Sequence, residues 1–308
     1  MRVAVVDIGT NSTRLLIADV ESSGAVAVLV RQSRVTRLGE RVDLGHGLAE
    51  EAIKRTCTVL TDYRQLIDQY DCQANLAVLT SAVRDASNGA AFTEHVRRDY
   101  GLDARTLSGE EEAQLTFLGA MSDRDGHSAT PTVVIDIGGG STEFVVGHGH
   151  LAGFHTSLQA GVVRMSERHI HTDPPAPEEL QQLALDTRTI FLEGLPPEER
   201  APVARGIAVA GTATAAAGID LELEPYDPDR VHGYKLLLAT VELLLARLAE
   251  MTEDQRRSVA GLHPDRAPTI VAGMILLSEA MRAFELEEVE VSEHDILRGG
   301  ALRLAGLG

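Results

Sequence analysis

The stretch Val5–Ile17, VVDIGTNSTRLLI, is repeated at Val134–Val146 as VIDIGGGSTEFVV. Asp, Ile, Gly, Ser and Thr recur in register, and apolar runs flank both copies. Each copy predicts a strand, a tight turn that begins with glycine, and a second strand. A single Asp-x-Gly turn is a common hairpin signal, but self-similarity over a whole motif indicates a duplicated architecture.

Both predicted turns contain groups that suit a phosphate oxygen. A turn rich in glycine, serine and threonine presents backbone N–H groups and hydroxyls in a small concavity. The aspartate that ends each first strand, Asp7 or Asp136, only accepts hydrogen bonds when ionised and can hold a divalent cation or its waters. Two such motifs predict two similar domains that face one cleft and hold a phosphate between them.

The remaining hydrophobic pattern predicts three strands, a helix, a strand and a helix in each half, which is a duplicated α/β fold. For the first half we expect strands 2–7, 13–20 and 25–31, helix 48–70, strand 76–80, helix 89–99, strand 103–107 and a helix to Met121. For the second half we expect strands 132–137, 143–147 and 151–156, helices 160–170 and 177–192, a strand followed by a glycine turn within 206–212, and a short helix 213–217. Helices 234–249, 252–260 and 266–284, strand 289–292 and helix 293–304 complete the pattern.

A polar stretch at 122–131, which contains Asp, Gly and Pro, is expected to link two domains. The domains then cover residues 1–121 and 132–292. We expect the C-terminal helix, within 293–308, to pack back on the first domain.

Composition excludes several classes of protein. The 308 residues are 44% hydrophobic and 24% charged, which is ordinary for a soluble globular protein of two domains. The formal net charge of −18 argues against a nucleic-acid partner, which would select a basic face. Asp7 interrupts the N-terminal apolar stretch and no apolar run could span a bilayer, so we expect neither signal peptide nor membrane, and a cytoplasmic location.

The metal-ligating side chains show no familiar pattern. Cys57 and Cys72 are the two cysteines, and neither belongs to a CxxC pair, so we expect neither a disulfide framework nor a structural zinc site. Among the eleven histidines the close pairs are His148/His150 and His169/His171, and we expect them to be solvated at the surface.

Two groups of charged residues could have either a functional or a purely structural role. Arg31, Arg34, Arg37 and Arg41 could form a locally positive face for a polyanion or simply a solvated strand face, and Arg14 and Arg84 lie near predicted loops. Ser108 followed by Glu110–Glu112 predicts the capped N-terminus of a helix, where acids complement the helix dipole.

Taken in order, these motifs resemble those of the exopolyphosphatase / guanosine pentaphosphate phosphatase family, within the superfamily of actin-like ATPases, sugar kinases and heat-shock proteins. The matching segments are Asp7–Arg14, Arg37–Glu40, Thr80–Ala86, Leu107–Ala113, Asp136–Glu143, Ala210–Thr212, Arg266–Ala267, Ala272–Gly273 and Leu297–Gly300. They span nearly the whole chain. The resemblance implies two actin-like (ribonuclease H-like) α/β domains flanking a cleft. Longer family members add a C-terminal helical domain, so the chain resembles the short two-domain form.

The resemblance also implies roles for individual residues. The expected phosphate-binding residues are Gly9, Thr10, Asn11, Ser12, Gly138, Gly139, Gly140, Ser141, Thr142 and Gly211. Asp136, Glu143 and Asp7 are the expected ligands of Mg²⁺, directly or through water, and Glu143 is also a candidate catalytic carboxylate. Arg84 is expected to pair with a phosphate in bidentate fashion. Glu112, which immediately precedes the alanine of the motif, is the expected base that activates water, and Glu111 is its main alternative.

The activity implied is removal of the terminal phosphate from inorganic polyphosphate, with a tilt toward short chains because a compact two-domain cleft offers few distal phosphate contacts. Hydrolysis of the 5′ γ-phosphate of guanosine pentaphosphate would use the same groups. A kinase or ATPase would need an adenine pocket and an acceptor site, and a non-catalytic phosphate or nucleotide sensor would lack the catalytic residues. We also expect a homodimer.

Overall fold

The computed structural model describes residues 1–40, 42, 47–124 and 126–307, which form two compact units. The first unit consists of Met1–Asp123 and the C-terminal segment that begins at His294. The second unit is Arg124–Glu293. The chain therefore passes from one unit to the other at Asp123 and returns at His294. In the part of the chain that is described, no helix combines the length and the apolar character needed to cross a membrane.

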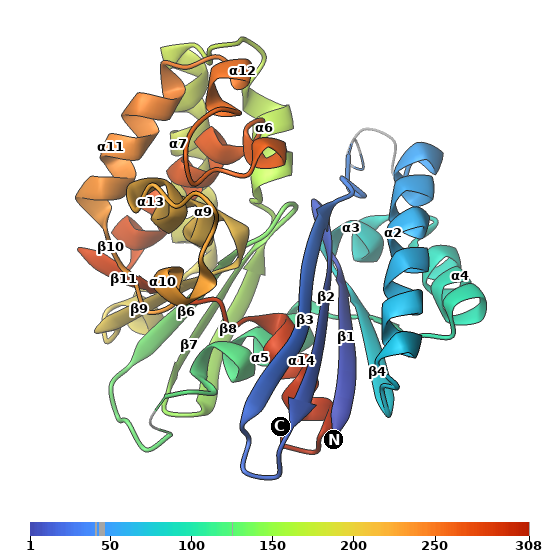
Figure 1. The fold of residues 1–308 in the computed structure, drawn as a ribbon. Coiled ribbons are helices and arrows are strands. Elements are labelled where there is room, and N and C mark those ends of the chain that lie inside the picture. Colours follow the sequence, from blue (N-terminus) through green and yellow to red (C-terminus); the bar gives the residue numbers. More distant parts are fainter. Residues whose placement is uncertain (41, 43–46, 125, 308) are drawn as a thin grey trace. The chain divides into compact units, whose positions relative to one another are not determined.

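The first unit is built on a five-stranded sheet with the order β3-β2-β1-β4-β5 (Figure 1). Strands β1, β2 and β3 form an antiparallel meander, whereas β4 and β5 extend the sheet in parallel. The strands are β1 (Arg2–Ile8), β2 (Ser12–Val20), β3 (Val26–Val35), β4 (Ala74–Leu79) and β5 (Ala104–Thr106). β3 runs four residues beyond the expected end of the third strand.

Helices cover both faces of this sheet because its central strand, β1, has apolar side chains on both faces. Ala4, Val6 and Ile8 of β1 pack into a core with α2 and α4, while Val3 and Val5 pack with α14 on the opposite face. The helices of the first unit are α2 (Glu50–Gln69), α3 (Ser81–Asp85), α4 (Gly89–Tyr100), α5 (Gly109–Met121) and α14 (Ile296–Leu304). The sequence pattern predicted no helix at α3.

Two glycines let α5 and α14 approach at backbone distance. A Cβ on Gly119 would lie 1.9 Å from the carbonyl oxygen of Asp295, and a Cβ on Gly299 would lie 1.9 Å from that of Leu115. Any larger residue would push the helices apart. The Leu-Arg-Gly-Gly motif of the sequence analysis therefore has a packing role: it fixes the helix that contains Glu112 against the C-terminal helix.

The second unit is built on a six-stranded sheet with the order β10-β11-β9-β6-β7-β8. Its strands are β6 (Thr132–Ile137), β7 (Thr142–His148), β8 (Leu151–Leu158), β9 (Arg205–Val209), β10 (Lys235–Leu237) and β11 (Glu288–Val291). Its helices are α6 (Val162–His169), α7 (Pro177–Gly194), α8 (Pro197–Arg200), α9 (Ala210–Asp220), α10 (Pro228–Val231), α11 (Leu238–Ala249), α12 (Glu253–Arg256) and α13 (Ile270–Ala283), with a 3-10 turn η1 (Pro264–Arg266).

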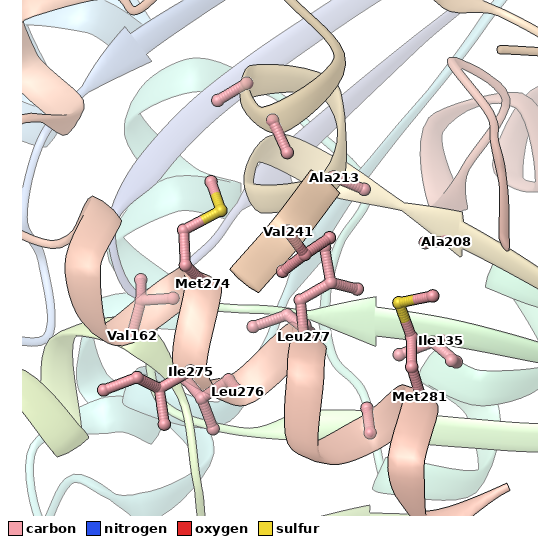
Figure 2. Packing of buried hydrophobic residues seen from close by; sticks show 14 of the residues in the cluster. Ile135, Val162, Ala208, Ala213, Val241, Met274, Ile275, Leu276, Leu277 and Met281 are labelled. Atoms are coloured by element: carbon pink, nitrogen blue, oxygen red, sulfur yellow. The ribbon is translucent and has the colours of Figure 1, made fainter. Parts of the chain in front are cut away.

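The core of the second unit surrounds α13, whose side chains are buried on almost every side. Figure 2 shows Met274, Leu277 and Met281 of α13 among residues of the strands and neighbouring helices. Those partners include Ile135, Val162, Ala208, Ala213 and Val241. A helix that is apolar all round is typical of such a central position.

Four expected helices of the second unit have the wrong bounds. The helix expected at 213–217 spans Ala210–Asp220, so the residues expected to form a glycine turn are its first residues. The helix expected at 234–249 begins only at Leu238, because Lys235–Leu237 pairs with β11 as an antiparallel strand. The helix expected at 252–260 ends at Arg256, and the one expected at 266–284 begins at Ile270 after η1. Strand pairing supplied by distant residues overrides local helix preference at Lys235–Leu237.

Candidate functional site

The repeated motif forms the same hairpin in each unit. In the first unit β1 pairs with β2 so that Asp7 lies opposite Arg14, and the N–H of Gly9 donates to the carbonyl of Ser12 at 3.0 Å. In the second unit Asp136 of β6 lies opposite Glu143 of β7, and the corresponding bond from Gly138 to Ser141 is 2.9 Å. The sequence duplication is therefore a duplication of backbone geometry, down to the register.

Each turn keeps backbone donors available for an anion. Within the described part of the chain, the N–H groups of Thr10 and Asn11 have no hydrogen-bond partner, and neither have those of Gly139 and Gly140. The turn carbonyls, by contrast, are used: the N–H of Val162 donates to Gly138 and that of Val163 to Gly139, at 2.9 and 2.8 Å. Unused N–H groups in a tight turn form a concavity that binds phosphate oxygens.

Neighbouring loops brace the first turn. The hydroxyl of Thr10 lies 2.9 Å from that of Ser81 at the start of α3, and both side chains are buried. The carbonyl of Thr10 accepts from the N–H of Gly39, and that of Asn11 accepts from the N–H of Arg37. Arg37 has a φ of 49°, an uncommon left-handed conformation for a side-chain-bearing residue. The turn thus sits on a fixed support that includes α3.

Arg84 and Glu112 form a partly buried ion pair in the first unit. Arg84 lies on α3, not on the predicted loop, and its Nη1 donates to Glu112 Oε2 at 2.9 Å and to the carbonyl of Leu107 at 3.1 Å. Glu112 is 8% exposed in the first turn of α5. No hydrogen bond of Nε or Nη2 of Arg84 to a described residue exists, so one edge of the guanidinium remains available for another oxygen.

Glu111 has a different and structural task. Its carboxylate accepts from the N–H of Ser108 at 2.8 Å, and the Ser108 hydroxyl accepts from the N–H of Glu111 at 3.2 Å. This reciprocal pair is a capping box that closes the N-terminus of α5. The hydrogen bonds from Ser108 lower the pKa of Glu111. Of the two candidate bases, Glu112 is therefore the one whose carboxylate is not used for capping.

Asp7 belongs to a buried cluster that the sequence analysis did not identify. Its Oδ2 accepts from Nε and Nη2 of Arg14 at 2.8 and 2.6 Å, and Arg14 also pairs with Asp295. Asp295 is 2% exposed, caps α14 through the N–H of Leu297, and lies 3.9 Å from Arg31. Burial raises the pKa of Asp7, whereas Arg14 and Arg31 together overcome burial and lower the pKa of Asp295. Local sequence signals mark Asp295 only as a helix cap, so its pairing with Arg14 could not be foreseen.

The corresponding pair in the second unit consists of two carboxylates. Asp136 and Glu143 are directly opposite each other, so their side chains lie on the same face of the sheet, and they are 8% and 2% exposed. Glu143 Oε1 accepts hydroxyl hydrogen bonds from Ser141 at 2.5 Å and from Ser157 of β8 at 2.7 Å. The two serines orient the Glu143 carboxylate, and Ser157 lies outside all the motifs found in the sequence. Oxygen ligands of this kind are those that Mg²⁺ prefers.

Gly211 makes room for an arginine. A Cβ at this position would lie 1.8 Å from Nη1 of Arg266, so the guanidinium packs directly on the glycine. The preceding Ala210 has a φ of 60°, which is a strained value for alanine. The cationic group at the start of α9 is thus Arg266, a residue that the sequence analysis included in a motif but did not select for the site.

The basic stretch does not form one continuous face. Arg31 of β3 lies opposite Leu16 and shares a face with Arg14, whereas Arg34 lies opposite Thr13 on the other face. Arg37 follows in the loop that supports the first turn, and Arg41 lies outside the described residues. Arg31 and Arg34 are both exposed, as the solvated alternative expects, but they lie on opposite faces of the sheet and so do not form one positive face.

The paired histidines lie mostly at the surface, as expected. His148, His150 and His171 are exposed, whereas His169 is partly buried and its Nε2 lies 2.9 Å from Asp186. Both cysteines are free.

Comparison with known proteins agrees with this geometry. The model of the Ppx/GppA phosphatase family matches residues 16–303. The chain is 38% identical to exopolyphosphatase 2 of Mycobacterium tuberculosis over 99% of both chains. It is similar in structure to an exopolyphosphatase-like protein, with a TM-score of 0.92, 32% identity and coverage of 98% and 97% of the two chains. The Ppx/GppA family member of Aquifex aeolicus gives a TM-score of 0.82 and 30% identity over 99% and 97%.

Proposed function

Because the chain belongs to the Ppx/GppA phosphatase family, with two actin-like α/β units, we propose that it is an exopolyphosphatase. In this reaction a water oxygen attacks the terminal phosphorus of inorganic polyphosphate, the phosphoanhydride P–O bond breaks, and orthophosphate and a shortened chain are released. The observation that supports the proposal most directly is the ion pair of Arg84 with the buried Glu112, because Arg84 lies on α3, the helix whose Ser81 contacts Thr10 of the first phosphate turn.

Glu112 is the proposed general base. A base must be held in a defined orientation, and Arg84 Nη1 holds Glu112 Oε2 at 2.9 Å. The remaining edge of Arg84 would bind a phosphate oxygen, so that one guanidinium orients both the base and the substrate. Glu111 is excluded from this role in the proposal because its carboxylate closes the capping box of α5.

The two glycine turns are the proposed phosphate cradles. Thr10 and Asn11 in one turn, and Gly139 and Gly140 in the other, offer backbone N–H groups to the charged oxygens. Phosphoryl transfer depends mainly on positioning and on stabilising the charge of these oxygens. Fixed backbone dipoles do this without reorganisation during the reaction.

Asp136 and Glu143 are the proposed Mg²⁺ ligands. Two carboxylates placed opposite each other on a buried sheet face favour a divalent cation, whereas the equivalent position in the first hairpin is an arginine that neutralises Asp7 directly. When bound, the cation would neutralise phosphate oxygens. We therefore propose that Asp7 serves as the ion-pair partner of Arg14, and that only Asp136 and Glu143 are Mg²⁺ ligands.

The preference for short chains is part of the proposal. Long polyphosphate would need a continuous positive track, and Arg31 and Arg34 lie on opposite faces of the first sheet. The formal charge of −18 also disfavours broad contact with a polyanion. A cytoplasmic location and a homodimer stay predictions from the sequence.

Phosphate release from polyphosphates of defined length, measured beside guanosine pentaphosphate and ATP, tests the proposal. We expect kcat/KM to be highest for short polyphosphates. A higher kcat/KM for guanosine pentaphosphate would assign the alternative family activity, and a preference for ATP would indicate an ATPase. Tight binding of polyphosphate without phosphate release would indicate a sensor and overturn the proposed hydrolysis.

A further inference from the structure

A cysteine, a histidine and an aspartate form a chain of contacts between α2 and α4 of the first unit. Cys57 Sγ lies 3.4 Å from Nε2 of His95, and Nδ1 of the same ring lies 2.8 Å from Oδ2 of Asp99. Cys57 is on α2, whereas His95 and Asp99 are one helical turn apart on α4. The order is that of a nucleophile, a base and a group that orients the base.

The imidazole is fixed by its surroundings. The His95 ring packs edge-on to Tyr100, with ring centroids 6.0 Å apart, and lies 6.3 Å from Phe92 on its own helix. Tyr100 in turn donates a hydrogen bond to the carbonyl of Cys57 at 3.0 Å. Tyr100 therefore links the backbone of the cysteine to the ring that faces its thiol.

The contacts select one tautomer of His95. Asp99 also accepts from Arg98, and this hydrogen bond lowers the pKa of Asp99 and keeps its carboxylate ionised. An ionised carboxylate only accepts hydrogen bonds, so Nδ1 of His95 donates to it. Arg98 Nη2 also approaches Nδ1, but at 3.4 Å rather than 2.8 Å. Nε2 is then the unprotonated nitrogen, and its lone pair faces the thiol of Cys57.

We propose that Cys57 is a reactive thiol and the site at which small soft electrophiles modify this protein. His95 takes the thiol proton at Nε2, and the resulting imidazolium is stabilised by Asp99 and by the adjacent thiolate. The thiolate is the reactive species, and a neighbouring imidazolium is one of the features that increase its population near neutral pH. Cys57 is partly exposed, so a small reagent can reach it.

The thiolate sulfur of Cys57 forms a bond to the carbon of iodoacetamide, the carbon–iodine bond breaks, and iodide leaves with the bonding electrons. The proton removed from the thiol stays on Nε2 of His95 until it is lost to solvent. Neither an oxidant nor a further reactant is required.

The second cysteine gives an internal control. Cys72 is also free and partly exposed, but burial raises the pKa of its thiol. The intact protein is treated with iodoacetamide at neutral pH, and the alkylated peptides are quantified over time. We expect Cys57 to react at least about tenfold faster than Cys72, as thiolate-controlled reactivity implies.

The variant His95→Gln separates activation from simple exposure. Glutamine retains polar contacts but is not a base, so the Cys57 rate should fall toward that of Cys72 while the Cys72 rate stays unchanged. Far-UV circular dichroism and phosphatase activity verify that the variant is folded. Equal rates at the two cysteines in the wild type, or an unchanged Cys57 rate in folded His95→Gln, would overturn the proposal.

Discussion

Two adjacent glutamates at the start of α5 have different physical surroundings. Glu111 closes a capping box with Ser108 at the helix end. Glu112 is 8% exposed and is held by Arg84. Only one helical position separates them, but that position rotates the side chain by about 100° and turns it from the helix end to the protein interior. This difference gives a matched pair of variants.

Glu112→Gln should reduce kcat for polyphosphate by ~10²-fold or more, because the amide keeps the shape of the side chain but cannot accept a proton. KM should change little, since the phosphate turns are untouched. Glu111→Gln is the control: glutamine also serves in a capping box, so activity and stability should stay near wild type. Steady-state phosphate release decides between them, and the reverse pattern would transfer the base to Glu111.

At the level of single residues, part of the candidate site could be predicted from the sequence. The turn residues follow from a local motif, so their N–H groups could be predicted from the repeat. Asp295 and Arg266 could not, because each is brought to its partner by chain far away in sequence: Asp295 to Arg14, and Arg266 to Gly211. Spacing along the chain contains no signal for such pairs. The choice between Glu111 and Glu112 likewise needed the geometry of the helix end.

At the level of elements, the predictions succeeded where periodicity is strong. α2 spans Glu50–Gln69, close to the expected helix, and its buried side chains form one stripe. The predictions failed where contacts with distant residues determine the secondary structure: β10 was expected to be helical, and α3 was not expected at all. A three-residue strand and a five-residue helix are too short to show a period, so their neighbours define them.

Asp295 connects two elements, α14 and the first hairpin, and its substitution should test that connection. Asp295→Asn keeps a good helix cap but removes the charge that faces Arg14. We expect a loss of about 3 kcal/mol in the free energy of unfolding, the lower end of the cost of removing one partner from a buried ion pair, because Arg14 keeps Asp7 as a partner. Because the chain has no tryptophan, urea unfolding is followed by circular dichroism.

Asp295→Ala is the companion variant for this prediction. It removes both the charge and the cap, and should cost about 1 kcal/mol more than Asp295→Asn. An Asn variant with wild-type stability would show that the pair with Arg14 contributes nothing to the fold.

The two hairpins also give a paired test of the metal site. Asp136→Asn should raise the Mg²⁺ concentration needed for half-maximal rate by about tenfold or more, because a ligand oxygen loses its charge. Asp7→Asn, the equivalent change in the other hairpin, should leave that concentration unchanged, because Asp7 pairs with Arg14. Phosphate release is titrated with Mg²⁺ for each variant. An equal increase in both would make Asp7 a ligand as well.

At the level of the whole molecule, the charge distribution determines how substrate is bound. The chain has 46 acidic and 28 basic side chains, which gives the net charge of −18. Many of its arginines are also engaged in ion pairs with carboxylates, as Arg14 is with Asp7 and Arg84 with Glu112. Affinity for a polyanion must then come from a few local donors rather than from a broad positive surface.

This charge distribution predicts that the affinity for polyphosphate decreases only weakly as the salt concentration rises. A protein that neutralises six to ten phosphates of a polyanion loses about 10³–10⁵ in affinity between roughly 50 and 200 mM salt, by analogy with DNA binding. For short polyphosphate we expect a loss of about tenfold or less, the value for about two neutralised phosphates on the same scale. The measurement is KM against added monovalent salt at fixed free Mg²⁺, with guanosine pentaphosphate as a second substrate. A loss of a hundredfold or more would show that a basic track dominates binding, although Arg31 and Arg34 lie on opposite faces of the sheet. In that case Arg31, Arg34 and Arg37 would be the first residues to substitute.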